Sequence, residues 1–233
     1  VGRRAVELDM SKFDSERKLD SERKLEHVFW LGGSPCAGKT SISDLLAARF
    51  DLDVYPVDKA FEVHAQNFDP ELHPSLTKWR ASSWNQRWMQ PLETLLQDVI
   101  ACYQEHFTLI LADILSLPTD RPLLVEGSAL LPRQVGGVLA ERSRAIWVVP
   151  TAGFQTEHYA RRDWVPGVLE QCDDSEAAFH NWMERDAGFA RWLTTEVNAL
   201  GLELLRVDGK QTIEENAEAV VSHFRLAADM LRT

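Results

Sequence analysis

One stretch of eight residues constrains this chain more than any other: Gly33-Ser34-Pro35-Cys36-Ala37-Gly38-Lys39-Thr40. It fits the pattern of Gly, four residues, Gly, Lys and then Ser or Thr that forms a phosphate-binding loop between a strand and a helix. Gly33 and Gly38 allow backbone N–H groups to approach a polyphosphate closely. Lys39 offers a positive charge to the outer phosphates, and the Thr40 hydroxyl can bind Mg²⁺.

The residues around this stretch supply the context that the motif requires. Residues 27–31 form a short apolar run typical of a buried strand. Apolar residues then recur at helical spacing: Ile42, Leu45, Leu46 and Phe50. A helix that begins at the loop directs its unpaired N–H groups and its dipole toward an anion. The alternative is a chance match to a glycine-rich turn, which this context disfavours. We therefore predict that Gly33 to Thr40, together with Ser41, bind a nucleotide.

Short apolar strands alternate with helices along the rest of the chain. We predict strands at 27–32, 53–57, 122–125, 145–149 and 202–207. We predict helices at 39–50, within 71–116 in two pieces broken around Pro91, at 175–200 and at 213–231. This alternation indicates an α/β fold, in which helices cover both faces of a parallel sheet. Ligands of such sheets bind at the carboxyl ends of the strands, so the residues that end each strand are candidate site residues.

Composition narrows the class of protein. A hydrophobic content of 45% over 233 residues supports the core of one large domain. No apolar run reaches the roughly 20 residues that cross a bilayer, and we expect no membrane partner. With three widely spaced cysteines and no signal-peptide pattern, we expect a reduced, cytoplasmic setting. The net charge of −11 disfavours nucleic acid as a partner but leaves room for one small phosphorylated ligand. A homodimer is compatible with the sequence.

Residues 1–26 differ from the rest of the chain. They contain a direct duplication, in which residues 14–19 recur as residues 20–25. One Leu in every six residues builds no helical stripe. We interpret this segment as a solvated N-terminal helix or arm, with an origin in an expression vector as the alternative for part of it. The predicted nucleotide-binding domain is 27–233.

Two acidic residues follow predicted strands. Asp58 follows the strand at 53–57, where a carboxylate can accept or orient the proton of a substrate hydroxyl; the alternative is an N-cap for a helix at 59–66. Glu126 follows the strand at 122–125, where an acid can hold Mg²⁺ or orient the attacking group. A buried acid without a partner is costly, which favours a cation or hydrogen-bond donors nearby. We predict that both are catalytic, and that Thr40 and Glu126 bind the metal.

Three arginines come after the fourth predicted strand. Arg161 and Arg162 follow it closely, and Arg185 lies on the helix at 175–200. Phosphoryl transfer spreads negative charge over the transferred group, and mobile arginines can offset that charge. We predict that all three are catalytic. The alternative is a set of surface ion pairs with nearby acids: Asp163, Glu184 and Asp186.

The segment 59–116 is the predicted acceptor-binding part of the chain. Within it, Arg80, Trp84 and Arg87 have the spacing of one helical face. Aromatic and guanidinium groups on one face could clamp a planar or phosphorylated acceptor, so we predict that these three residues and Asp58 bind substrate. The alternative is that the tryptophans of this segment pack in the core. No pair of histidines in the chain has metal-ligand spacing.

The sequence resembles the P-loop kinases of the nucleoside-monophosphate-kinase-like group, which includes adenylate, shikimate and gluconate kinases and antibiotic phosphotransferases. The residues that carry the resemblance are Gly33 to Thr40, Asp58, Glu126-Gly127, Arg161-Arg162 with Arg185, and Val207-Asp208-Gly209 followed by Thr212-Ile213-Glu214-Glu215. The resemblance covers about residues 27–231. It implies a P-loop NTPase fold with a five-stranded parallel sheet in the order 2-3-1-4-5, a lid at 151–174, and Asp208 and Gly209 beside the adenine.

From these residues we predict ATP- and Mg²⁺-dependent phosphoryl transfer to a hydroxyl or phosphate of a small molecule. Lys39 and the loop amides would bind the β- and γ-phosphates, and positioning and electrostatics would supply most of the rate. Two alternatives remain: a regulatory nucleotide-binding module that hydrolyses slowly, and a kinase that acts on a nucleic-acid end or a protein. The acceptor, and the choice between ATP and GTP, stay open at this point.

Overall fold

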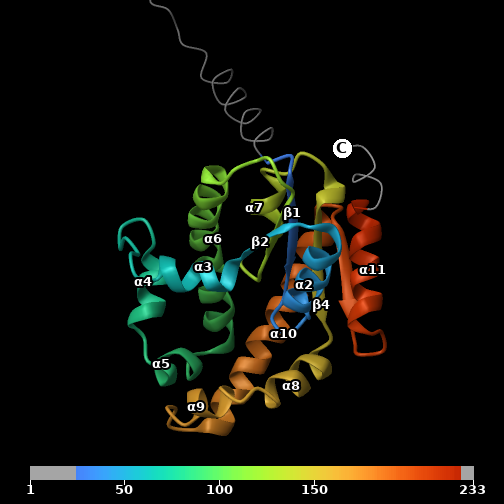
Figure 1. The fold of residues 1–233 in the computed structure, drawn as a ribbon. Coiled ribbons are helices and arrows are strands. Elements are labelled where there is room, and N and C mark those ends of the chain that lie inside the picture. The colour runs from blue at the N-terminus through green and yellow to red at the C-terminus, as the bar shows by residue number, and fades with distance from the viewer. Residues whose placement is uncertain (1–24, 227–233) are drawn as a thin grey trace, which may run out of the picture.

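The computed structural model describes residues 25–226, with a five-stranded parallel sheet at their centre (Figure 1). The strands are β1 (Val28–Gly33), β2 (Asp53–Pro56), β3 (Leu123–Glu126), β4 (Ala145–Pro150) and β5 (Glu203–Val207). Their order in the sheet is β2-β3-β1-β4-β5. The predicted α/β fold and strand order are therefore confirmed. The predicted arm lies outside the described residues as far as residue 24.

The register of the sheet brings the ends of three strands together. All residues of β1, β3 and β4 are buried, as expected of central strands in a sheet covered on both faces. Glu126, the last residue of β3, lies opposite Leu31 of β1 and Pro56 of β2. The residues that follow β1, β2 and β3 therefore leave the same edge of the sheet.

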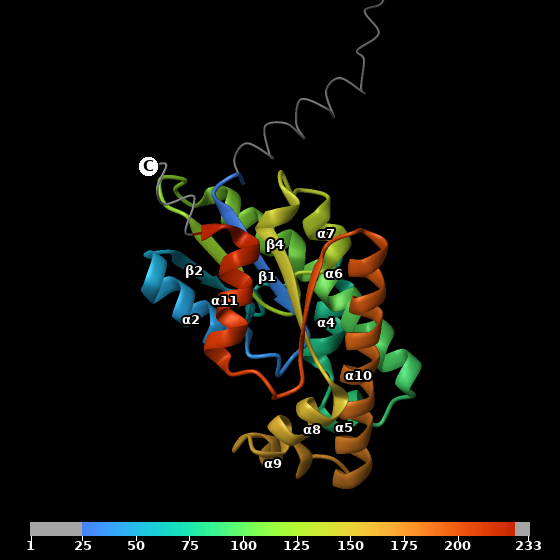
Figure 2. The same ribbon diagram turned by 90° about the vertical axis from the view of Figure 1, so that its right-hand side faces the viewer.

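Helices cover both faces of the sheet (Figure 2). One face carries α2 (Lys39–Phe50) and α11 (Ile213–Phe224), and the other carries α6 (Leu92–Ser116), α7 (Pro132–Gly136) and α10 (Ser175–Ala199). Alternate residues of the strands feed the two cores. Trp30 and Val125 belong to the core under α6 and α10, whereas Leu31 and Leu124 belong to the core under α2 and α11.

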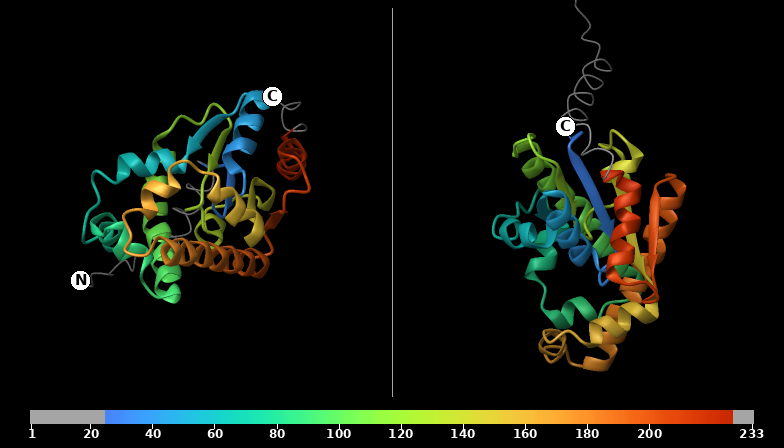
Figure 3. Two further views of the ribbon diagram at one scale, coloured as in Figure 1. Left: turned by 90° about the horizontal axis from the view of Figure 1, so that it is seen from below. Right: turned by 45° about the vertical axis from the view of Figure 1, so that its right-hand side comes forward.

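The remaining helices lie between the strands in sequence. α3 (Val57–His64), α4 (Pro74–Ala81) and α5 (Trp84–Trp88) precede α6, the short helix η1 (Arg142–Arg144) precedes β4, and α8 (Ala152–Ala160) and α9 (Val165–Leu169) precede α10. Figures 1 and 3 show α5, α8 and α9 together at one end of the molecule. A smaller core joins them to α10 through Trp88, Tyr159, Val165 and Trp182. No helix in the described part is long and apolar enough to span a membrane.

Some predicted element boundaries are wrong. The segment 71–116 forms three helices rather than two, because Ser83 and Gln86 make a capping box that starts α5. The last helix ends at Phe224, where Arg225 adopts a left-handed backbone with φ of 58°, and residues 227–231 lie outside the described part. Leu45, expected on the buried face of α2, is 38% exposed.

Candidate active site

The Gly33–Thr40 loop leaves β1 and leads directly into α2. Gly33 has φ of 139°, and a Cβ there would lie 2.0 Å from the carbonyl oxygen of Val148 in β4, so no side chain fits. Gly38 has φ of 80° and is the N-cap residue of α2. Cys36 has φ of 60°, which is uncommon for a residue with a side chain. The loop is thus tightly curled at the N-terminus of a 12-residue helix.

Lys39 is buried inside the loop that precedes it. Its Nζ donates hydrogen bonds to the carbonyl oxygen of Ser34 at 2.9 Å and to Oγ of Ser128 at 3.1 Å. Burial lowers the pKa of Lys39, whereas the charges of Asp58 and Glu126 raise it. Two carboxylates therefore lie close enough to the ammonium group to favour its charged form. Ser128 follows β3 and was missed in the sequence, because a single serine carries no pattern.

Thr40 and Glu126 form the second contact between the loop and β3. Oγ1 of Thr40 donates to Oε1 of Glu126 at 3.3 Å. Glu126 is 4% exposed, and burial raises the pKa of its carboxyl, while Lys39 and the bond from Thr40 lower it. Among residues 25–226, no group of three or more His, Cys, Asp and Glu side chains could hold a metal ion. The hydroxyl and carboxylate fit Mg²⁺, which is usually held by one or two carboxylates together with phosphate oxygens.

Asp58 lies in the first turn of α3, two residues after β2. The N-cap position belongs to Pro56, so the alternative that Asp58 caps a helix is wrong. A Cβ on Gly127 would lie 2.4 Å from Cβ of Val57, so the glycine after β3 lets α3 approach the sheet this closely. The Asp58 side chain lines a pocket beside the loop, and its charge acts on Lys39. Asp58 thus links the loop to that pocket.

Gln155 fastens α8 to the Gly33–Thr40 loop. Its Nε2 donates to Oγ of Ser34 at 3.2 Å and to the carbonyl oxygen of Pro35 at 2.8 Å. The side chain is 1% exposed, so these bonds are shielded from water. Sequence reasoning missed this residue, because a lone glutamine within a helix carries no recognisable pattern. The start of the predicted lid is therefore attached to the loop.

The two neighbouring arginines of the predicted lid point to different partners. Arg161 is exposed and forms an ion pair with Glu157 one helical turn earlier, so the structure does not bring it to the loop. Arg162 lies close to Cys36: burial raises the pKa of this thiol, and the charge of Arg162 lowers it. The Arg162 guanidinium also lies 5.4 Å from the ring centroid of Tyr159. Only Arg162 of this pair faces the loop.

Arg185 lies on α10, and its side chain is 14% exposed. Its Nε lies 2.5 Å from Oδ1 of Asp186, and the guanidinium carbon lies 4.8 Å from the ring centroid of Trp88. Burial raises the pKa of the Asp186 carboxyl, and Arg185 opposes this rise. The alternative of an ion pair with Asp186 is thus observed, but in the interior rather than at the surface.

The prediction that Arg80, Trp84 and Arg87 share one helical face is wrong. α4 ends at Ala81 and α5 begins at Trp84, so the three residues lie on two helices. Arg80 turns away and donates to the carbonyl oxygen of Ala65 at 2.5 Å. Arg87 lies between two indole rings, 3.8 Å from the centroid of Trp79 and 4.4 Å from that of Trp84. Trp84 and Arg87 line the pocket beside Asp58, and Arg80 is not part of its lining.

This pocket, which we call the aromatic pocket, has a volume of about 380 Å³. It lies among α3, α4, α5, α6 and α10, and Trp164, in the connection between α8 and α9, also lines it. Its aromatic lining consists of Phe61, Trp79, Trp84, Trp88, Tyr103, Trp164 and Trp182. Asp58 and Arg185 are among its charged lining residues. A small molecule would fit between these walls.

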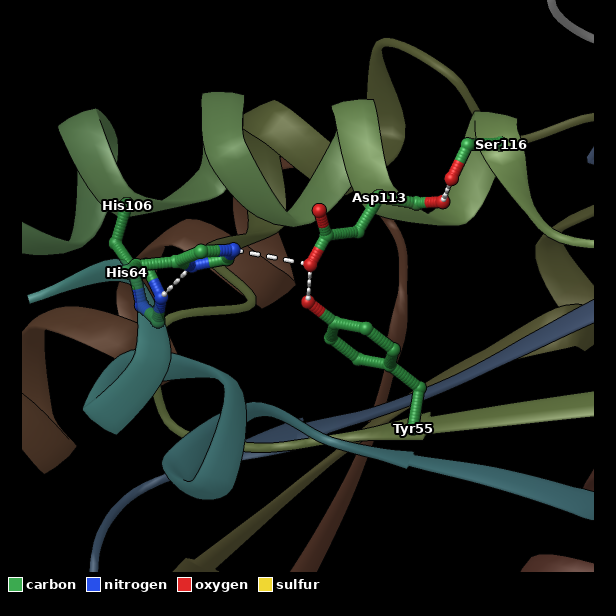
Figure 4. Close-up of polar contacts among 5 residues, drawn as sticks. All are labelled: Tyr55, His64, His106, Asp113 and Ser116. Carbon is green, nitrogen blue, oxygen red and sulfur yellow. Dashed lines mark hydrogen bonds and ion pairs between the residues drawn. The ribbon is translucent and has the colours of Figure 1, made fainter. Parts of the chain in front are cut away.

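A polar network holds α3 against α6 at the back of the aromatic pocket (Figure 4). His106, which lines the pocket, has its Nε2 3.1 Å from Nδ1 of His64. Nε2 of His64 lies 2.9 Å from Oδ2 of Asp113, which also accepts from the hydroxyl of Tyr55 at 2.6 Å. Burial lowers the pKa of His106 to about 3, so it is neutral at pH 7. The network fixes the helix that carries Asp58.

The turn after β5 lies on the side of the Gly33–Thr40 loop opposite the aromatic pocket, because β5 and β2 are the two edge strands of the sheet. The Asp208 side chain accepts a hydrogen bond from the backbone of the same turn, as the simple turn interpretation requires. A Cβ on Gly209 would lie 3.1 Å from the ring of Phe154, and a Cβ on Gly38 would lie 3.0 Å from Cδ1 of Ile213. The turn is therefore packed beside both α8 and the loop. That Asp208 and Gly209 border a nucleotide base stays a prediction.

Comparisons with known proteins leave the family of this chain open. No protein-family profile matches the sequence, and no curated protein matches it. Among solved structures, the chain is similar to a protein of Chloroflexus aurantiacus J-10-fl described as a "putative kinase". The likeness has a TM-score of 0.37 and 16% sequence identity, and it covers 84% of this chain and 97% of the other.

Proposed function

We propose that this chain is an ATP- and Mg²⁺-dependent P-loop kinase that phosphorylates a small molecule. The observation that supports this most is the convergence of Lys39, Thr40, Asp58 and Glu126 at the carboxyl edge of the sheet. A cation, a hydroxyl and two carboxylates meet there, beside a pocket of about 380 Å³. A pocket of this size suits a small acceptor better than a polymer.

Donor binding uses the loop and the end of β3. Lys39 would exchange its bonds to Ser34 and Ser128 for bonds to phosphate oxygens, which are stronger because both partners are charged. The N–H groups at the start of α2 favour the same anion. Thr40 and Glu126 would hold Mg²⁺, which when bound offsets the charge of the phosphates.

Acceptor chemistry uses Asp58. Its carboxylate takes the proton of an acceptor hydroxyl while the hydroxyl oxygen bonds to the γ-phosphorus of ATP. The bond from that phosphorus to the bridging oxygen breaks, and ADP leaves with the electron pair. Arg162, near the loop, would offset the charge that spreads over the transferred group. Arg185, in the pocket wall, would do so only if it exchanged its pair with Asp186 for the transferred group. Arg161 has no part in this step while it stays paired with Glu157.

Calorimetric titration of the full chain with ATP, with and without Mg²⁺, tests the proposed binding of the phosphoryl donor. We expect binding that Mg²⁺ strengthens, and a Thr40→Val variant that loses most of this strengthening because it lacks the hydroxyl. Thr156→Val, at an exposed position of α8, is the matched control and should bind like the parent chain. If neither ATP nor GTP binds in the presence of Mg²⁺, the proposal is wrong.

ADP release distinguishes a kinase from a slow regulatory NTPase. A kinase releases ADP faster when an acceptor is present, because water is the poorer nucleophile in its site. A regulatory module uses water and should show a rate that no acceptor changes. A coupled ADP assay across a set of small hydroxyl compounds therefore decides between the two.

A further inference from the structure

The aromatic pocket concentrates the tryptophans of the chain. Five of its eight tryptophans line the pocket: Trp79, Trp84, Trp88, Trp164 and Trp182. The rings of Trp88 and Trp182 are stacked, with 4.5 Å between centroids and 13° between planes. Such walls favour a flat apolar group, since aromatic faces offer a large contact area and prefer stacked or edge contacts with another ring.

Every cation that lines the pocket already has a partner in the protein. Lys78 Nζ lies 2.8 Å from Oδ2 of Asp98, and Arg185 is paired with Asp186. Arg87 lies between two indole rings and donates to a backbone carbonyl oxygen at 2.6 Å. A phosphate or carboxylate that enters must displace an acid from Lys78 or Arg185, or displace the indole rings that cover Arg87.

The carboxylates that line the pocket also disfavour an anionic ligand. Asp58, Glu62 and Asp98 line it, against the three cations Lys78, Arg87 and Arg185. Within the described residues, neither Asp58 nor Glu62 forms an ion pair. Asp186 adds a further negative charge behind Arg185. The lining therefore has no excess of positive charge with which to attract an anion.

One residue that lines the pocket also lies close to Lys39 of the Gly33–Thr40 loop, where the phosphoryl donor is proposed to bind. Of the groups whose charges act on Lys39, Asp58 alone lines the pocket. A hydroxyl that approaches Asp58 is therefore directed toward Lys39, while the rest of the molecule lies among the tryptophans. The volume of about 380 Å³ accommodates one or two aromatic rings.

We infer that the acceptor is an aromatic alcohol that carries no phosphate or carboxylate group. This inference rests on the proposed function, because it takes the aromatic pocket as the acceptor site. The ring lies between the indoles, and the hydroxyl lies at Asp58, where it loses its proton as it gains the phosphoryl group.

A matched pair of probes tests the charge preference: 4-nitrobenzyl alcohol and 4-nitrobenzoate. Both probes carry a nitrophenyl ring, but only the benzoate is charged. The nitro group quenches tryptophan fluorescence, so the loss of the protein's fluorescence on titration, measured without nucleotide, reports binding of either probe. We expect the alcohol to bind at least about tenfold more tightly than the benzoate. Trp84→Leu, at a half-buried position, should weaken binding of the alcohol several-fold, and Trp192→Phe, outside the pocket, should leave it unchanged. Thermal melts of both variants verify that they fold.

Two results would overturn the inference. One is a benzoate that binds as tightly as the alcohol, and the other is alcohol binding that Trp84→Leu does not weaken. A parallel titration with ATP and Mg²⁺ separates this inference from the proposed function. ATP binding without alcohol binding refutes the acceptor class alone, whereas alcohol binding without any nucleotide binding refutes the kinase and leaves an aromatic binding site.

Discussion

The Gly33–Thr40 loop and the aromatic pocket meet at Asp58 and differ in how the chain builds them. The loop is made of eight consecutive residues, and Lys39 bonds to a carbonyl group only five residues earlier. The pocket takes residues from 57 to 185, on five helices and the connections between them. A site made by local backbone geometry can be recognised from a motif, whereas a site made by helix packing depends on where each helix ends.

The largest effect is expected in the loop. Lys39→Ala should lower the kcat/KM of ADP release by about 10²- to 10³-fold, because it removes the cation that would face the transferred phosphoryl group. The fold should persist, since the substitution removes a buried charge rather than core packing. Lys59→Ala, next to Asp58 but exposed, is the control. Activity within tenfold of the parent chain would remove the loop from the donor role.

The second prediction concerns how much stability is lost when a side chain is added at a glycine of the loop or of α8. Gly33→Ala should lower the free energy of unfolding by about 3 kcal/mol, since its Cβ would lie 2.0 Å from a carbonyl oxygen of β4. Gly153→Ala in α8, where nothing lies within 4 Å, should be neutral or stabilise by about 0.5 kcal/mol. Urea unfolding measures both. Equal effects would mean that the loop is no more constrained than the lid.

The third prediction concerns the pocket wall. Because burial lowers the pKa of His106 from 6.5 to about 3, the unfolded chain binds a proton between these values that the folded chain does not. The contribution of His106 to stability is therefore complete above about pH 6.5 and falls by about 2 kcal/mol between pH 6.5 and pH 5.

Urea unfolding of His106→Gln across this pH range checks the third prediction. The variant should show a flatter profile than the parent chain, and His180→Gln, at an exposed position, should not. Glu126, whose pKa is raised, changes the free energy of unfolding with pH in the opposite direction. It is present in both proteins, so the difference between the profiles of the parent chain and His106→Gln isolates the effect of His106. Identical profiles for the parent chain and His106→Gln would contradict the buried neutral histidine.

The smallest effect separates the two neighbouring arginines of the predicted lid, Arg161 and Arg162. Arg162→Gln should lower the kcat/KM of ADP release by about tenfold, because it removes a charge near the loop. Arg161→Gln should change it less than about twofold, since its exposed pair with Glu157 contributes little. If the two variants lose activity equally, the lid must rearrange to bring both arginines to the site.

The strands of the sheet and the loop could be predicted because their patterns are local, whereas the strand order was predicted only from the resemblance to P-loop kinases. Continuous apolar runs marked the central strands, and α2 begins at Lys39 and ends at Phe50 as its apolar spacing predicted. The break before α5 could also have been found. Ser83-Trp84-Asn85-Gln86 is a capping-box pattern that was present in the sequence.

Other parts of the site could not be predicted, because they depend on tertiary packing. Ser128 and Gln155 are single polar residues whose roles arise only when β3 and α8 meet the loop. The pairing of Arg161 with Glu157, and not with the site, follows from the direction in which α8 presents it. The aromatic pocket likewise needs Trp164 and Trp182, which follow the predicted acceptor segment by more than 45 residues in sequence.

The attachment of Gln155 limits how the predicted lid could move. Because its amide binds Ser34 and Pro35, the first turn of α8 moves with the loop. A closing movement that keeps these bonds pivots near Gln155, so Trp164, beyond the far end of α8, moves farthest. Phe154, packed beside Gly209, stays near the pivot and hardly moves. The predicted lid can therefore close on an acceptor without disturbing a nucleotide already in place.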